Sequence, residues 1–179
     1  MDNSFFAYLQ QLELIAFFSG YPLIYLIILS FAGNRQEKNN FMSRLILLLP
    51  FAYAFIGTLF LGYQLKNLYP HYSVENIKAT FQHPYLTAWA LLSLLFWLPA
   101  IAKKKVLSLL HSLVFFFFIV KDLFLQLSAL SGGNDVVRND MKIYTLSLLL
   151  NLGSVALIGL LFFLFSFLKK RGRTSSLQE

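Results

Sequence analysis

Long runs of apolar residues alternate along the chain with short polar segments. Each run is about as long as the roughly 20-residue helix that crosses a bilayer core about 30 Å thick. No alternating strand pattern is present, and only a helix satisfies its own backbone hydrogen bonds in hydrocarbon. We therefore expect an all-α integral membrane protein with five transmembrane helices. The predicted spans cover residues 14–32, 45–63, 85–102, 106–127 and 143–168.

The segments between these runs leave no room for a separate soluble domain, because the longest polar stretch is only about twenty residues. We expect a single five-span bundle over residues 1–173 and a short polar tail over residues 174–179. The N-terminal segment has neither the basic region nor the small-residue cleavage site of a secretory signal peptide. We expect it to be retained.

The composition agrees with this class, since 58% of the residues are hydrophobic and only 13% are charged. The net charge of +7 alone would also suit a nucleic-acid-binding protein. However, the basic residues flank the apolar runs and do not gather on a polar face. We therefore expect the lipid bilayer and other membrane proteins as partners, and no nucleic acid.

The distribution of Lys and Arg predicts the orientation of the spans. Ten of the fifteen basic residues lie in the segment after the first span, in the segment after the third span and after the fifth span. The other five share their side with six of the eight acidic residues. Because cytoplasmic loops are enriched in Lys and Arg, we expect an external N-terminus and a cytoplasmic C-terminus, in the plasma or bacterial inner membrane. The ten residues are Arg35, Lys38, Arg44, Lys103, Lys104, Lys105, Lys169, Lys170, Arg171 and Arg173.

Two opposite charges, Lys121 and Asp122, interrupt the apolar sequence VFFFFIVKDLF of the fourth span. They lie about 24 Å along a helix that enters the core at Val106, so they are shallow and either mark the end of the span or belong to a site. Asp122 shares one helix face with His111 and Gln126, and this face should point into the bundle.

The fifth span offers polar partners on one stripe, Ser147 and Asn151. We expect these two side chains to hydrogen-bond Asp122 or Gln126. Together with Lys121 and His111 they form a candidate binding or relay stripe. The alternative is that they only hold helices together, at about 0.6 kcal/mol per bond.

Small residues and prolines predict the packing of the first three spans. Ala54, Thr58 and Gly62 recur at a spacing of four and form a ridge that another helix can approach closely, inside the bundle or from a partner. Prolines at 22, 50 and 99 should kink these spans, above all near Gly20 and Pro22. Tyr and Trp residues near the span ends, Tyr53 among them, are interpreted as interfacial anchors.

Specific chemistry is weakly indicated. The three histidines are scattered without a metal-ligand spacing, and cysteine is absent, so we expect no metal and no cofactor. Ser108 and His111 are helix neighbours, but no carboxylate lies near them to orient the imidazole.

The sequence therefore favours a non-catalytic subunit, scaffold or assembly factor of a larger membrane complex. A small transporter or ion- or proton-conducting subunit that uses the Asp/Asn/His stripe is the alternative. An intramembrane enzyme comes third.

Overall fold

The structure is a computed structural model that describes residues 13–33, 40–69, 73, 84–128 and 134–175. Its described part is all-helical, without strands. Three helical stretches are long and apolar enough to cross a membrane, Glu13–Phe31, Ser43–Leu68 and Met141–Lys169. The all-α prediction is thus confirmed for the described residues, and the apolar helices are consistent with a membrane protein.

The first apolar stretch is helical over residues 13–18, is interrupted by a turn at Ser19 and Gly20, and continues as α2 (Tyr21–Gly33). Pro22 lies in the first turn of α2, where its missing N–H costs least. The hydroxyl group of Ser19 donates to the carbonyl of Ile15 at 2.6 Å, which helps to end the preceding turn. The bend predicted near Gly20 and Pro22 is therefore present as a break in the helix.

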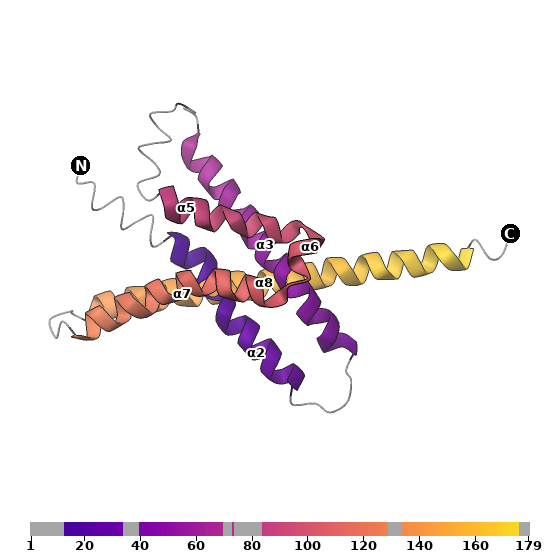
Figure 1. Ribbon diagram of the computed structural model, residues 1–179, viewed down its shortest axis with the longest axis horizontal. Helices are drawn as coiled ribbons and strands as arrows, with labels where there is room; N and C mark the ends of the chain where they lie inside the picture. Colours follow the sequence, from indigo (N-terminus) through magenta and orange to yellow (C-terminus); the bar gives the residue numbers. More distant parts are fainter. Residues whose placement is uncertain (1–12, 34–39, 70–72, 74–83, 129–133, 176–179) are drawn as a thin grey trace.

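The second stretch is α3 (Asn40–Leu68), which lies at the centre of the bundle. It continues through Pro50, which is fully buried. Its neighbours are α2, α8 (Asn134–Ser175) and a 3₁₀ helix, η1 (Leu92–Trp97). Figure 1 shows α3 crossing the long α8 near the middle of the molecule.

The third predicted span, residues 85–102, is not one helix. It consists of α5 (Pro84–Leu91), η1, an extended Leu98 and α6 (Pro99–Ala102). Pro99 explains the break, because a residue before proline is driven out of the helical region, and Leu98 has φ −74° and ψ 119°. By their rises per residue, α5 and η1 together extend about 24 Å.

The fourth and fifth predicted spans form a helical hairpin. They are α7 (Lys105–Ser128) and α8, and Figure 1 shows α7 beside the first half of α8. Helix α8 begins at Asn134, nine residues before the predicted start at 143, so much of the predicted external loop is helical. Its C-terminal half extends away from the other helices (Figure 1).

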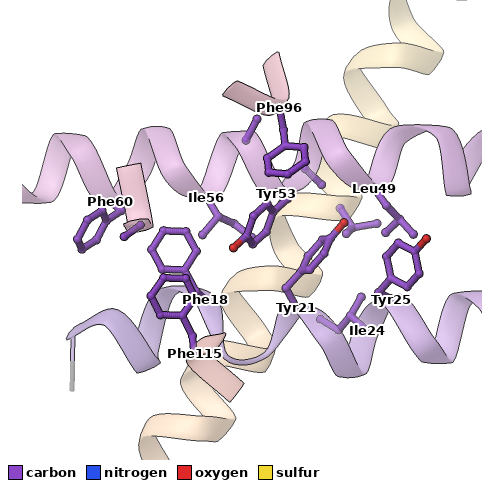
Figure 2. Packing of buried hydrophobic residues seen from close by; sticks show 14 of the residues in the cluster. Phe18, Tyr21, Ile24, Tyr25, Leu49, Tyr53, Ile56, Phe60, Phe96 and Phe115 are labelled. Atoms are coloured by element: carbon purple, nitrogen blue, oxygen red, sulfur yellow. The ribbon is translucent and has the colours of Figure 1, made fainter. Parts of the chain in front are cut away.

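Aromatic rings fill the core where α2, α3 and α7 meet, as Figure 2 shows. The ring centroids of Tyr21 and Tyr53 are 4.4 Å apart, and those of Phe18 and Phe115 are 4.8 Å apart and stacked. All four side chains are fully buried. Phe18 also packs on Phe60 of α3, and Tyr21 also hydrogen-bonds Ser108 of α7, so both halves of the first stretch contact α3 and α7.

Candidate functional site

A buried polar layer surrounds His111 of α7. Its Nε2 lies 2.8 Å from the carbonyl oxygen of Trp89, and its Nδ1 lies 2.7 Å from the hydroxyl group of Tyr53. A carbonyl oxygen only accepts hydrogen bonds, so Nε2 carries the hydrogen, and Nδ1 of a neutral imidazole accepts from Tyr53. Both ring nitrogens are therefore engaged in joining α7 to α5 and α3.

Trp89 of α5 returns the contact. Its Nε1–H donates to the carbonyl of His111 at 3.3 Å, and the two rings stack with centroids 4.8 Å apart at 7°. Each ring thus donates to the backbone of the other residue. This reciprocal pair fastens α5 onto α7. From the sequence, α5 was predicted to be the first part of a continuous third span.

Ser108 belongs to a second buried contact and not to a catalytic pair with His111. The Ser108 hydroxyl donates to the carbonyl of Lys105 at 2.8 Å. Its single hydrogen is then used, so the hydroxyl of Tyr21, 2.9 Å away, donates to Ser108 Oγ. Ser108 and His111 are consequently held by different tyrosines, Tyr21 and Tyr53.

Ser147 and Asn151 of α8 form hydrogen bonds with backbone groups at the break in the first stretch. The backbone N–H of Gly20 donates to Ser147 Oγ at 2.8 Å, and the Ser19 hydroxyl lies 3.2 Å from the same atom. The Asn151 amide nitrogen donates to the carbonyls of Phe17, at 2.9 Å, and of Ser147, at 2.8 Å. The stripe of α8 therefore serves the peptide groups that the interrupted helix leaves without helical partners.

The predicted hydrogen bonds from Ser147 and Asn151 to Asp122 or Gln126 stay a prediction, because the side chains of Asp122 and Gln126 lie outside the described residues. The rings of Phe116 and Tyr144 face each other across the hairpin, 6.3 Å apart. From that level Asp122 lies about 9 Å toward the hairpin loop, whereas Asn151 lies about 10 Å away from it. The offset of about 20 Å arises because α8 begins nine residues earlier than predicted.

The remaining members of the candidate stripe are not brought to these contacts. Lys121 is exposed, and the side chains of Asp122 and Gln126 lie outside the described residues. A role for Asp122, Lys121 or Gln126 stays a prediction. Of the six residues, the structure joins Ser147 to Asn151 and places His111 in a separate network.

The small-residue ridge of α3 is divided among three environments. Ala54 is fully buried, Thr58 accepts the indole N–H of Trp97 at 3.0 Å, and a Cβ at Gly62 would meet open space. The close approach on α3 is instead at Gly57, where a Cβ would collide with the Ser93 side chain of η1.

Sequence reasoning missed the partners of two residues. Tyr53 was expected to be an interfacial anchor, but its ring is fully buried and its hydroxyl binds His111. Glu13 accepts from Tyr63, at 3.0 Å, and from Gln64, at 3.3 Å. The charge pattern assigns Glu13 and the end of the second span to the same side of the membrane. This assignment could have predicted the contact.

Comparison with known proteins yields no match: no family model matches the chain, and no curated protein or solved structure is significantly similar to it. Among the described residues, no group of three or more His, Cys, Asp or Glu side chains is placed to hold a metal ion.

Proposed function

We propose that the protein is a non-catalytic polytopic membrane protein that acts as a subunit, scaffold or assembly factor of a larger membrane complex. The observation that carries this proposal is the use of the buried polar side chains. Tyr53 with His111 and Asn151 with Phe17 join separate helices, as does Tyr21 with Ser108. Their hydrogen bonds serve the assembly of the bundle.

The same contacts weigh against an intramembrane enzyme. A general base needs a ring nitrogen within reach of the proton that it abstracts. Both nitrogens of His111 are bound to groups of the bundle itself. The nearby Ser108 accepts from Tyr21 and donates its hydrogen to the carbonyl of Lys105, so this hydrogen is not directed to the imidazole. Catalysis by this pair would require both networks to open.

The surface of α8 supports contacts with other membrane proteins. Only 22% of the most apolar part of Met141–Lys169 is buried inside the structure. The corresponding shares are 56% for Glu13–Phe31 and 44% for Ser43–Leu68. Leu160, Phe163 and Phe165 are 65%, 68% and 71% exposed. A helix that is apolar all round is stable in lipid or against other apolar helices. Helix α8 therefore provides surface for a partner helix within the bilayer.

The proposal includes the five-span topology with an external N-terminus and a cytoplasmic C-terminus. The interrupted third span is compatible with it, because about 24 Å of α5 and η1 is short of a core about 30 Å thick by an amount that the bilayer accommodates by thinning. The exposed Lys103 and Lys104 then lie at the cytoplasmic end of that span.

The experiment that tests the proposal is purification of the tagged protein from its native membrane in a mild detergent, followed by mass spectrometry. We expect a stoichiometric membrane partner. A double variant, Leu160→Ala with Phe163→Ala, should lose this partner. The control is Leu26→Ala with Leu29→Ala on α2, which also alters two exposed side chains. A protein that is reproducibly free of partners would contradict the proposal.

The transporter alternative keeps one supporting observation, the break in the first stretch beside Asn151. Interrupted membrane helices commonly form substrate and ion sites in transporters. Ion or proton flux in liposomes that contain only this protein, lost on Asp122→Asn and Asn151→Leu without loss of folding, would favour the alternative. Absence of flux, together with a co-purifying partner, would favour the scaffold.

A further inference from the structure

The side-chain oxygen of Asn151 is buried without a hydrogen-bond partner among the described residues. Asn151 is fully buried, and its amide nitrogen donates to two carbonyl oxygens, those of Phe17 and Ser147. Rotating the amide by 180° would place Oδ1 against these two acceptors, so the orientation is fixed by the contacts. Oδ1 then remains as an acceptor that lacks a donor.

The surrounding backbone is also rich in acceptors. Pro22 has no N–H, so the carbonyl of Phe18 lacks the donor that a continuous helix would supply from the fourth residue onward. The N–H of Gly20 is directed to Ser147 Oγ, and the carbonyl of Ala16 loses its usual partner in the same way. The break thus leaves the carbonyls of Ala16 and Phe18 without their usual helical donors.

The missing group must be small and must donate hydrogen bonds. By helical rise, the backbone positions of Asp122 and Gln126 in α7 lie about 20 Å or more from Asn151 along the hairpin, and an ionised Asp122 has no hydrogen to donate. Water meets both requirements, because buried waters in proteins typically bond otherwise unsatisfied polar groups.

We propose that a water molecule is bound at the break in the first stretch and donates a hydrogen bond to Asn151 Oδ1. It bridges α8 to the peptide groups freed at residues 16–18. The break is then a hydrated joint within the apolar part of the protein, about midway along Glu13–Phe31. This inference does not depend on the proposed function, because a scaffold and a transporter can both contain the water.

Water-edited solid-state NMR of the full chain in lipid bilayers tests the proposal. The sequence contains one Leu–Asn pair, Leu150 and Asn151, so labelling of leucine carbonyls and asparagine isolates Asn151 without a mutation. Phe115 is the control. It is the second residue of the one Val–Phe pair of the chain, is fully buried and stacks on Phe18 beside the break.

We expect magnetisation from water to reach Cγ of Asn151 several-fold faster than it reaches the ring of Phe115. Equally slow transfer to both residues would overturn the proposal, since Oδ1 would then have no water. Equally fast transfer to both would also overturn it, because the bundle would be open to bulk water and would not hold one bound molecule.

Discussion

His111 and Trp89 hold each other by two opposed hydrogen bonds, in which each aromatic ring donates to the backbone carbonyl of the other residue. The rings stack face to face between these bonds. Because the second nitrogen of the imidazole accepts a hydrogen bond from Tyr53, the side chain of His111 joins three helices, α3, α5 and α7. A histidine that looks like a candidate for proton transfer in the sequence is thereby a structural connector in the fold.

Replacing His111 by leucine should destabilise the protein. The change leaves the Tyr53 hydroxyl and the Trp89 carbonyl buried without their partner, and each such loss costs about 1 to 3 kcal/mol. The free energy of unfolding, measured by titrating SDS into mild-detergent micelles, should fall by at least the lower figure. The control is Leu110→Ala, on the neighbouring exposed position. Equal stability of His111→Leu and the control would contradict the connector role.

The sequence predicts the helices better than it predicts their pairing. Apolar runs locate helical segments, and the lack of an N–H in Pro22 and Pro99 locates two breaks. The start of α8 at Asn134 was missed because the polar residues 134–142 read as a loop. Because of that error, Asn151 was predicted at the depth of Asp122. The contact between Phe116 and Tyr144 instead places Asp122 on the loop side of this level and Asn151 on the opposite side.

The candidate site was predictable by residue type but not by partner. Polar residues on the inward faces of α7 and α8 were identified correctly as buried, since His111, Ser147 and Asn151 are all inside. Their partners, Tyr53, Trp89 and the turn at Gly20, come from distant segments. Helical periodicity defines a face within one helix and contains no information about which segment covers that face.

Gly20→Ala should destabilise the protein more than Gly62→Ala. A Cβ at Gly20 would lie 2.7 Å from the backbone carbon of Ser147, and backbone atoms cannot move aside cheaply. Overpacking of this kind costs about 1 to 3 kcal/mol. At Gly62 a Cβ meets open space, and the helix gains from the higher propensity of alanine. The same SDS titration compares both variants, and a lower midpoint for Gly62→Ala would refute the predicted close approach of α8.

The proposed orientation can be tested by single-cysteine labelling, because the native chain contains no cysteine. Lys66→Cys near the end of α3 should react with a membrane-impermeant maleimide added outside intact cells. Lys104→Cys, between α6 and α7, should react only after permeabilisation. Both residues are exposed lysines, so their accessibility is matched. The reverse labelling pattern would exclude an external N-terminus.

The register of the α7–α8 hairpin predicts which cysteine pairs cross-link. Phe116→Cys with Tyr144→Cys should form a cross-link under a short bifunctional maleimide in membranes, because the two rings are 6.3 Å apart. Asp122→Cys with Asn151→Cys should not, since about 20 Å separates these positions along the helices. Protease cleavage in the hairpin loop followed by gel electrophoresis distinguishes joined from separate fragments. Cross-linking of the second pair alone would restore the contact predicted from sequence and contradict the register of the hairpin.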